Sequence, residues 1–389
     1  MWDVVVVGAG PAGTATAITL ATNGWRVLLL EKQVSVTFKL GESLPPASIG
    51  LVKHFLGDLD GMDFNHTGLS KTAGNASVWT SDQIDIADFF FTTAGYGLCI
   101  DRLAFDENLR VKAADAGVTV LKGLAFKECE SVDDPVLNWQ LTLVSNSQKQ
   151  QHHARYLVDC SGRQAVVAKH LGVDRTCEDQ LFAYSQWFSL TGASDKDHFT
   201  RIEASPQGWW YSNRLPGLDD GEVKRLVVFH TDRDLPAARH ASSVAGFDEL
   251  LQGSNHIAPL LEEKGYRACG AIRGAPAGSQ KLKRFTGDAW MAVGDAAQAY
   301  DPLSSQGIYK ALDTGCQAAQ MIHYALTECS GDVAGLSTDN RYIRQYENQQ
   351  NQLWENYVAQ RDFYYGSQPR WSDQLFWSRR RFSGRPLKH

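Results

Sequence analysis

The opening residues constrain the fold of this 389-residue chain more than any other stretch. A run of mostly β-branched residues, Asp3–Val7, ends directly in a G-x-G-x-x-G pattern that spans Gly8–Gly13. A helix-like segment, Thr14–Asn23, follows, and a second apolar run, Val27–Leu30, ends at Glu31. A strand, a glycine turn, a helix and a second strand with a terminal acid, within about thirty residues, are typical of dinucleotide binding.

Each part of this pattern has a physical role at a pyrophosphate. The glycines allow a tight turn and a close approach of the backbone, and the N-terminus of the helix stabilises the negative charge. The carboxylate of Glu31 is placed to accept hydrogen bonds from a ribose hydroxyl. We therefore predict a nucleotide site here; the alternative is a glycine-rich turn that binds nothing.

Charge and composition bear on partners and location. The formal net charge is −6 and the pI is about 6.0, so neither nucleic acid nor a membrane is an expected partner. No apolar run reaches the length of a membrane span. The first residues are read as a core strand, which leaves no room for a signal peptide, and we expect a cytoplasmic protein. The one basic run, Arg379–Arg381, is expected to pair with carboxylates.

Cysteine and histidine spacing gives no sign of a metal site. The seven cysteines are odd in number and scattered, without a C-x-x-C pair, which argues against a disulfide framework and against zinc. The histidines show no ligand or triad spacing, and we interpret them, including His152 and His153, as surface residues.

The apolar patterns predict an α/β protein with two sheets, in which the segments of one sheet are inserted in the sequence between elements of the other. Strand-rich stretches, including Ile84–Phe91, are separated by a helix pattern, Arg102–Ala116, and by a strand, Val118–Leu121, that fit the nucleotide sheet. We predict a Rossmann-like nucleotide-binding domain, an interleaved antiparallel-sheet substrate domain and a helical C-terminal tail. The expected boundaries are 1–73, 101–178 and 285–330 for the first domain, 74–100 and 179–284 for the second, and 331–389 for the tail.

Four further stretches complement the opening motif. Asp159–Gly162 closes a strand with a tight turn, and Gly294-Asp295 follows the buried strand Ala289–Val293. Asp295 would then point into the crevice at the carboxyl ends of the strands, where ligands of such sheets bind. Asp301–Gly307 precedes a long helix pattern, whose free N–H groups would face the same crevice. Arg102 opens a helix after a strand and is a candidate fork for phosphate.

Together these motifs resemble the FAD-dependent monooxygenases of the para-hydroxybenzoate hydroxylase-like class, from Asp3 to about Ala319. The resemblance implies FAD as cofactor, with Gly294-Asp295 at its ribityl chain and the helix entrance at Asp301–Gly307 beside the flavin pyrimidine edge. Aligned N–H dipoles there would stabilise the negative charge of reduced flavin. The residues expected to bind FAD are Gly8, Gly10, Pro11, Ala12, Gly13, Glu31, Lys32, Gly41, Glu42, Ser43, Arg102, Asp159, Ser161, Gly162, Gly294, Asp295, Pro302, Ser305, Gln306, Gly307 and Ile308.

Gly41-Glu42-Ser43 and the arginine- and tryptophan-rich tail look like the halogenase-related subgroup of this class. Flavin-dependent tryptophan halogenases carry a lysine that relays hypochlorous acid, and Lys71 occupies the matching place, eight residues before Trp79. Their G-W-x-W-x-I-P motif reads here as Gly208–Arg214, with Tyr211 for the second tryptophan and without Ile-Pro. Lys71 is therefore either a halogenating lysine or a solvated loop lysine.

The stretches Gly74–Trp79 and Gly208–Ser212, with the tail, look more like a narrower group: the flavoproteins that mature cysteine tryptophylquinone in lysine ε-oxidase and glycine oxidase. The resemblance implies hydroxylation of a tryptophan in a precursor of a quinone-cofactor oxidase. Because no second G-x-G-x-x-G is present, we expect an external electron donor, either NAD(P)H or a flavin reductase. The alternatives are a flavin-dependent halogenase and a flavin-bearing chaperone without turnover.

Lys71 and Trp210 are the candidate catalytic residues. Strand alternation puts Trp209 and Tyr211 on one face and Trp210 on the other, so only part of this aromatic set can face a substrate. Phe89–Phe91 could also line the path of the substrate. The alternative for all these aromatic residues is the core of the second sheet.

Overall fold

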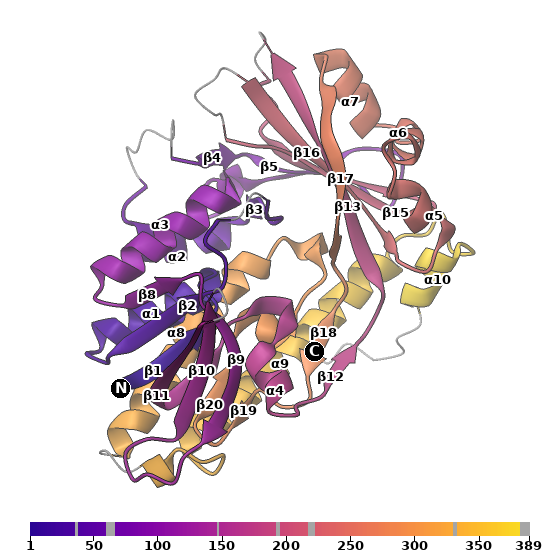
Figure 1. Cartoon of the computed structure of the whole chain (residues 1–389). Helices are drawn as coiled ribbons and strands as arrows, with labels where there is room; N and C mark the ends of the chain where they lie inside the picture. Colours follow the sequence, from indigo (N-terminus) through magenta and orange to yellow (C-terminus); the bar gives the residue numbers. More distant parts are fainter. Residues whose placement is uncertain are drawn as a thin grey trace.

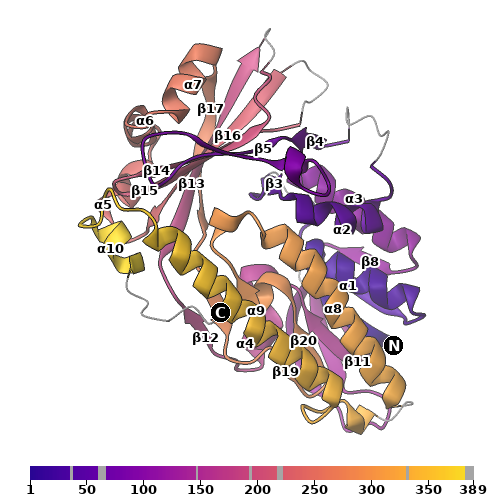
Figure 2. The ribbon, with the colours of Figure 1, turned by 180° about the vertical axis from the view of Figure 1, so that it is seen from behind.

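The computed structural model describes residues 1–35, 38–59, 67–145, 148–191, 195–216, 222–329 and 333–381. Two large β-sheets organise the molecule and lie at its opposite ends, each covered by helices (Figures 1 and 2). The predicted fold class is confirmed, because a Rossmann-like sheet is joined to a largely antiparallel one.

The first sheet has the opening strand near its centre. Its eight strands are β1 (Trp2–Val7), β2 (Val27–Glu31), β8 (Thr119–Lys122), β9 (Ala125–Ser131), β10 (Trp139–Ser145), β11 (Gln148–Asp159), β19 (Thr286–Gly287) and β20 (Trp290–Ala292). They run in the order β19-β20-β11-β1-β2-β8, and β10 pairs antiparallel with β9 on one side and with the first half of β11 on the other. The second half of β11 pairs in parallel with β1. This long strand therefore connects the antiparallel strands β9 and β10 to the parallel centre of the first sheet.

Helices cover this sheet because its central strands are apolar on both faces. α1 (Pro11–Thr22) packs against β1 and β2, and also against α3 (Arg102–Asp115) and α8 (Gly307–Glu328). The predicted helices are confirmed, although α1 begins at Pro11 instead of Thr14, since proline is well suited to the first helical position. The carboxylate of Asp101 caps α3 by accepting hydrogen bonds from the backbone N–H groups of Leu103 and Ala104.

The second sheet collects strands from two distant segments of the chain. Its members are β5 (Gly74–Val78), β6 (Asp85–Asp88), β13 (Leu181–Thr191), β14 (Phe199–Ser205), β15 (Gly208–Arg214), β16 (Glu222–Asp232) and β17 (Arg267–Pro276). The order is β17-β13-β16-β15-β14-β5-β6, antiparallel except between β14 and β5. One face is covered by α5 (Pro236–Ala241), α6 (Val244–Gln252) and α7 (Ile257–Lys264), and the other faces the first sheet.

One predicted strand is shorter in the observed structure, and another strand of this region joins neither large sheet. The strand expected over Ile84–Phe91 ends at Asp88, whose carboxylate accepts a hydrogen bond from the N–H of Phe90 and begins a short 3₁₀ helix over Phe89–Phe91. β7 (Gly97–Ile100) belongs to neither large sheet, because it pairs with β3 (Ser43–Leu44) and β4 (Leu69–Thr72).

The C-terminal helices bridge the two sheets. α9 (Arg341–Gly366) lies beside α8 and reaches α10 (Leu375–Arg381) below the second sheet (Figure 2). As predicted for the basic run, Arg379 pairs with Asp232 and Asp234, and Arg380 pairs with Asp232. The predicted tail also includes residues 382–389, which lie outside the described residues. The proposed division into domains stays a prediction.

The remaining short elements are α2 (Ile49–Leu56), α4 (Val166–His170) and a three-stranded sheet of β12 (Arg175–Cys177), β18 (Gln280–Leu282) and β21 (Gln298–Ala299). Among the described residues, none of the helices combines the length and the apolar character that crossing a membrane requires.

Candidate active site

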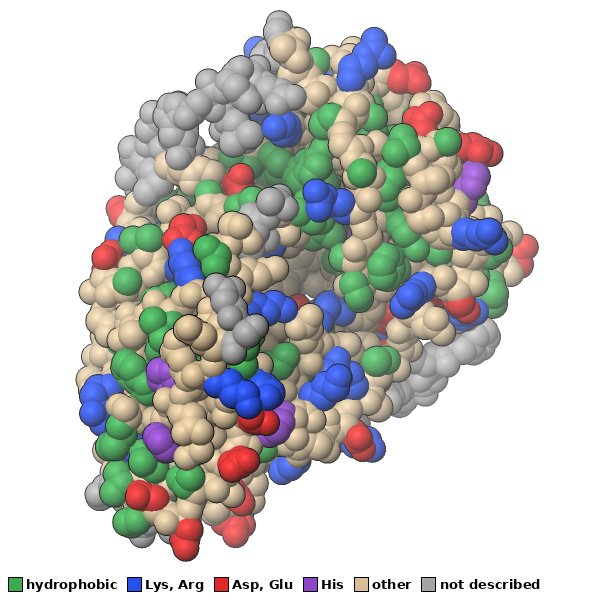
Figure 3. Space-filling model, in the orientation of Figure 1, with side chains coloured by type: hydrophobic (Ala, Val, Ile, Leu, Met, Phe, Trp, Pro, Cys, Tyr) green, Lys and Arg blue, Asp and Glu red, His purple; other side chains and the backbone are tan. Residues whose placement is uncertain are grey.

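A cavity of about 530 Å³ lies where the carboxyl ends of β1, β2 and β11 face the second sheet. Figure 3 shows the molecule hollowed between its two halves, with hydrophobic side chains gathered over the second sheet. Most of the residues predicted to bind the cofactor line this cavity: Gly8, Gly10, Pro11, Ala12, Glu31, Lys32, Gly41, Glu42, Ser43, Arg102, Ser161, Gly162, Asp295, Pro302, Ser305, Gly307 and Ile308.

The glycine turn brings backbone, and no side chain, to one wall of the cavity. Gly8 has a φ of 108°, a conformation that favours glycine. A Cβ atom on Gly10 would meet no atom within 4 Å, so the space above this residue is open to the cavity. Gly13 does not line the cavity; a Cβ atom there would lie 1.9 Å from the carbonyl oxygen of Gly8, so this glycine allows α1 to pack closely on the turn.

Three other predicted residues shape the site from behind its surface. The carboxylate of Asp159 accepts four hydrogen bonds, from the N–H and hydroxyl of Ser161 and from the N–H groups of Val167 and Ala168. Gly294 has a φ of 60° and comes so close to Ala12 that a Cβ atom would clash with its side chain at 2.7 Å. Gln306 occupies the N-cap position of α8.

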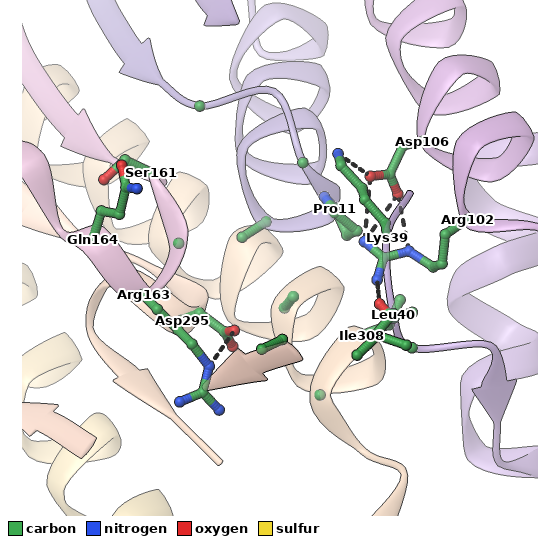
Figure 4. Close-up of a pocket in the computed structure, with 18 of the residues that line it drawn as sticks. Pro11, Lys39, Leu40, Arg102, Asp106, Ser161, Arg163, Gln164, Asp295 and Ile308 are labelled. Carbon is green, nitrogen blue, oxygen red and sulfur yellow. Dashed lines mark hydrogen bonds and ion pairs between the residues drawn. The ribbon is translucent and has the colours of Figure 1, made fainter. Parts of the chain in front are cut away.

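A cluster of two cations around one carboxylate forms a second wall. Asp106 on α3 accepts hydrogen bonds from Lys39 at 2.7 Å and from Arg102 at 3.2 Å, and is itself 1% exposed. Arg102 also donates to the carbonyl oxygen of Leu40, which fixes the segment that carries Gly41 and Glu42 (Figure 4). Sequence reasoning missed Lys39 and Asp106, because only the packing of α3 against this segment brings them together.

A second ion pair lies on the opposite side of the cavity. Arg163 approaches Asp295 to 3.9 Å (Figure 4). It also donates a hydrogen bond to the carbonyl oxygen of Tyr300 at 3.0 Å. Nearby, the carboxylate of Asp301 accepts a hydrogen bond from the N–H of Leu303 at 2.9 Å and shapes the turn before α8. The first N–H groups of α8 are thereby directed toward the cavity at Gly307.

Glu42 is a buried carboxyl group between the cavity and its surroundings. The residue is 3% exposed, and its Oε1 accepts a hydrogen bond from the N–H of Gly41 at 3.0 Å. Burial raises the pKa of Glu42 to about 7, and the nearby Arg102 guanidinium opposes this shift only in part. Its charge therefore changes near neutral pH.

One face of the second sheet forms the remaining wall. Ala183, Trp209, Tyr211, Val228, His230 and Ala275 line it from the adjacent strands β13, β15, β16 and β17. Trp209 and Tyr211 lie on this face, as strand alternation predicted. Trp210 lies on the opposite face, where its ring packs against Phe229 and Phe247 under the covering helices. Its predicted catalytic role is corrected accordingly: Trp210 is a core residue.

Lys71 is not among the described residues that line the cavity. It is exposed on β4, and its Nζ lies 4.4 Å from the centre of the Tyr96 ring. Phe90 and Phe91 do not line the cavity either, and these residues are 74% and 87% exposed. Of the aromatic candidates, Trp209 and Tyr211 line the cavity.

His230 contradicts the interpretation of the histidines as surface residues. It is 4% exposed, lines the cavity, and stacks on Trp209 with ring centres 3.7 Å apart. Burial lowers the pKa of His230 to about 3, so its imidazole is neutral near pH 7. The one signal in the sequence is its place in the apolar run of β16.

Comparisons with known proteins agree with a nucleotide site of this geometry. Residues 1–338 match the family described as "FAD binding domain". The chain belongs to this family. It is 30% identical over 385 residues to a protein of Marinomonas mediterranea named as an FAD-dependent oxidoreductase, LodB, covering 97% of this chain and 96% of that protein. It is 27% identical over 348 residues to the flavin-dependent halogenase armH3 of Armillaria mellea, covering 82% of this chain and 67% of that protein.

Two solved structures share the fold over nearly the whole chain. The myxobacterial chondrochloren halogenase CndH superposes with a TM-score of 0.82 at 23% identity, covering 98% of this chain and 86% of that one. The peptidyl tryptophan dihydroxylase QhpG superposes with a TM-score of 0.68 at 24% identity, covering 100% of this chain and 80% of that one. The protein is therefore a flavin-dependent oxidoreductase, and its cofactor is FAD.

Proposed function

We propose that the protein is a monooxygenase that hydroxylates an indole, preferably a tryptophan side chain in a precursor of a tryptophylquinone-containing oxidase. The observation that carries this proposal is an aromatic sheet face, with Trp209, Tyr211 and His230, that shares one cavity with the glycine turn. The name of QhpG supports it, since that protein is described as essential for tryptophylquinone cofactor biogenesis.

The cavity fits FAD at both of its ends. We assign the pyrophosphate to the open backbone at Gly8 and Gly10 and to the N-terminus of α1, and a ribose to Glu31. The N-terminus of α8 at Gly307 would lie at the flavin, where its free N–H groups stabilise negative charge on the reduced ring. When bound, FAD supplies the activation of molecular oxygen.

The protein itself supplies position and exclusion of water. Trp209 is 1% exposed and Tyr211 is 9% exposed. An aromatic ring that bound beside them would therefore be shielded from water. A flat apolar wall also restricts the orientation of that ring, and correct orientation of a reacting group contributes strongly to rate. We therefore expect the reaction to depend on the shape of this wall.

Halogenation of an aromatic substrate is the second candidate. The halogenase relatives and the fold of CndH favour it. The position of Lys71 speaks against it, because this lysine is exposed and lies outside the lining of the cavity.

The test is to incubate the holoenzyme with a reductant, oxygen, chloride, bromide and a candidate precursor of a tryptophylquinone-containing oxidase. Mass spectrometry of the precursor then identifies the atoms that were added. Added oxygen on a tryptophan is the expected result. Added halogen, abolished in Lys71→Ala, would establish the halogenase instead. Stable binding of the precursor without a mass change would favour a chaperone, and would refute the proposed monooxygenase.

A further inference from the structure

A second cavity, of about 300 Å³, lies beside the one described above. The linings of the two cavities share Lys39, Glu42 and Arg102. These residues stand near the end of the first cavity that is assigned above to the flavin. The neighbouring Gly41 shows this, since a Cβ atom on it would lie 3.6 Å from the side chain of Ile308 at the start of α8. A molecule in the second cavity would therefore lie next to the site of the reaction.

Both cavities lie along the same two strands of the second sheet. On β13 the first cavity is lined by Ala183 and the second by Trp187. On β16 the corresponding residues are Val228 and Lys224. Residues four positions apart on a strand point to the same face and, at about 3.3 Å per residue, lie about 13 Å apart. A peptide that lay extended along this face would cover the same distance with about four residues.

The lining of the second cavity carries more positive than negative charge. Its cations are Lys39, Arg102 and Lys224, and its carboxyl groups are those of Asp101 and Glu42. The carboxylate of Asp101 accepts hydrogen bonds from the first N–H groups of α3, so the positive end of that helix offsets its charge. Burial raises the pKa of Glu42 to about 7, so this group is only partly ionised at neutral pH. The cavity is therefore suited to an anion.

Lys39 retains hydrogen-bond donors for such an anion. Its Nζ carries three N–H donors, and the acceptor that it contacts among the described residues is Asp106, at 2.7 Å. Asp106 also pairs with Arg102, so the two cations and one carboxylate have a net charge of about +1. The side chain of Lys39 is 24% exposed, and a bound molecule can therefore reach it.

Size and shape restrict the anion further. The rings of Phe38 and Trp187 meet edge to face with their centres 6.0 Å apart, and both residues line the second cavity. Its volume lies at the lower limit of small-molecule sites, which measure about 300–1,000 Å³. The space is suited to one side chain with an apolar stem, and a dinucleotide such as NADH is too large for it.

We propose that the second cavity binds an acidic side chain of the precursor, about four residues from the tryptophan that is oxidised. This inference rests on the proposed function, because it takes the substrate to be a tryptophan within a protein chain. With the indole in the first cavity, the carboxylate would lie between Lys39 and Lys224. The acidic residue would thereby mark one tryptophan of the precursor for oxidation and exclude the others.

The test measures peptide binding to the FAD-loaded protein by titration calorimetry. The probes are nonapeptides of glycine and serine with blocked ends and a central tryptophan. One carries aspartate four residues before and four residues after the tryptophan, and the other carries asparagine at both places. The wild type should bind the aspartate peptide about tenfold more tightly, as a hydrogen bond between charged groups predicts. A third peptide, with aspartate two residues from the tryptophan, should lose this preference because its carboxylate cannot reach the second cavity.

Lys224→Glu tests the second cavity by itself. Lys224 lines this cavity and is not among the described residues that line the first. Reversal of its charge should abolish the preference for aspartate and leave binding of the asparagine peptide unchanged. Lys224→Met keeps an apolar stem without the charge and should lower the ratio in the same direction, which preserves the test if Lys224→Glu folds poorly. Lys149→Glu, at an exposed position of β11, is the control for net charge and should keep the tenfold ratio.

Three results would overturn the inference. The first is a wild type that binds neither nonapeptide or binds both equally. The second is a preference for aspartate that persists in both variants of Lys224. The third is slower reduction of FAD by NADH or NADPH in Lys224→Glu together with an unchanged preference, since the second cavity would then receive the electron donor.

Failure of this inference can be told from failure of the proposed function. If the aspartate peptide is preferred through Lys224 but the precursor gains no oxygen, the proposed monooxygenase fails and the acidic subsite stands. If oxygen is added to the precursor while the two peptides bind equally, the subsite fails and the monooxygenase stands.

Discussion

The hydroxyl group of Tyr365 donates a hydrogen bond to Oδ2 of Asp301 over 2.7 Å. The hydroxyl oxygen of Tyr365 in turn accepts a hydrogen bond from Nε1 of Trp209 over 2.9 Å. Tyr365 belongs to α9, Asp301 precedes α8, and Trp209 lies on β15, so one hydroxyl joins three parts of the chain. Because Trp209 and Asp301 both line the cavity, this hydroxyl lies directly behind its wall.

Replacement of Tyr365 by Phe should weaken the fold at this junction. The change leaves the indole N–H of Trp209 and one oxygen of Asp301 buried without this partner, and each costs about 1–3 kcal/mol. We expect the free energy of unfolding to fall by about 2–4 kcal/mol in urea denaturation. Tyr364→Phe is the matched control, since that residue is 52% exposed and its change should stay within about 0.5 kcal/mol. Equal effects of the two changes would contradict this account.

Glu42 should make stability depend on pH. Its pKa is about 7 in the folded protein and about 4.5 in the unfolded chain, so the folded state holds the proton more tightly. The stability from the protonated form is complete below about pH 4.5 and is lost as pH rises through 7. Glu42→Gln cannot ionise and keeps an oxygen for the N–H of Gly41.

The stability advantage of Glu42→Gln over the wild type should therefore grow by about 2 kcal/mol between pH 5 and pH 8.5. Urea denaturation of both proteins at each pH measures it. Glu263→Gln, at an exposed position, should show no such growth. An advantage that shrinks as pH rises would show that the assigned direction of the shift is wrong.

The two glycines of the opening turn should respond differently to alanine. Gly10→Ala meets no atom of the protein, and we expect the apoprotein to lose no more than about 1 kcal/mol of stability. Its methyl group would occupy the space assigned to the pyrophosphate, so FAD affinity should fall about tenfold or more in a flavin fluorescence titration. Gly13→Ala should instead destabilise the apoprotein by about 3 kcal/mol or more, because its methyl group would meet the carbonyl of Gly8. Unchanged FAD binding by a folded Gly10→Ala would exclude the assigned position.

Asp106→Asn should be strongly destabilising. Lys39 and Arg102 would lose the carboxylate that both of them contact, which is 1% exposed, and loss of one member of a buried ion pair costs about 3–5 kcal/mol. Since both cations are partly exposed, we expect about 3 kcal/mol by urea denaturation. Asp174→Asn, which breaks the exposed pair with Lys283, should change stability by less than about 1 kcal/mol. Comparable losses in the two variants would refute the importance of burial here.

Features set by short-range geometry could be predicted from the sequence. The turn at Gly8–Gly13 and the start of the helix at Arg102 depend on residues close in sequence, and alternation along one strand was enough to separate Trp209 from Trp210. The family resemblance extended the predicted FAD site to residues far along the chain, including Asp295 and Gly307, which line the same cavity as the glycine turn.

Features set by pairing between strands could not be predicted. His230 is buried because β16 lies between β13 and β15, and no spacing in the sequence gives that order. Likewise Asp106 had no visible role until the packing of α3 brought it to Lys39. Lys71 was matched by its distance from Trp79, yet β4 pairs with β7 in the small sheet, which carries this lysine away from the cavity.

The bridging position of α9 and α10 has a consequence for the order in which the protein matures during translation. The glycine turn leaves the ribosome well before Tyr365 and Trp377, which pack with Trp79 and Trp209. A nascent chain thus completes its nucleotide turn long before the wall behind Trp209 has its partners. We expect nascent chains that still lack α9 and α10 to expose Trp79 and Trp209. Synthesis of these two helices, and not binding of FAD, would then complete the wall of the cavity.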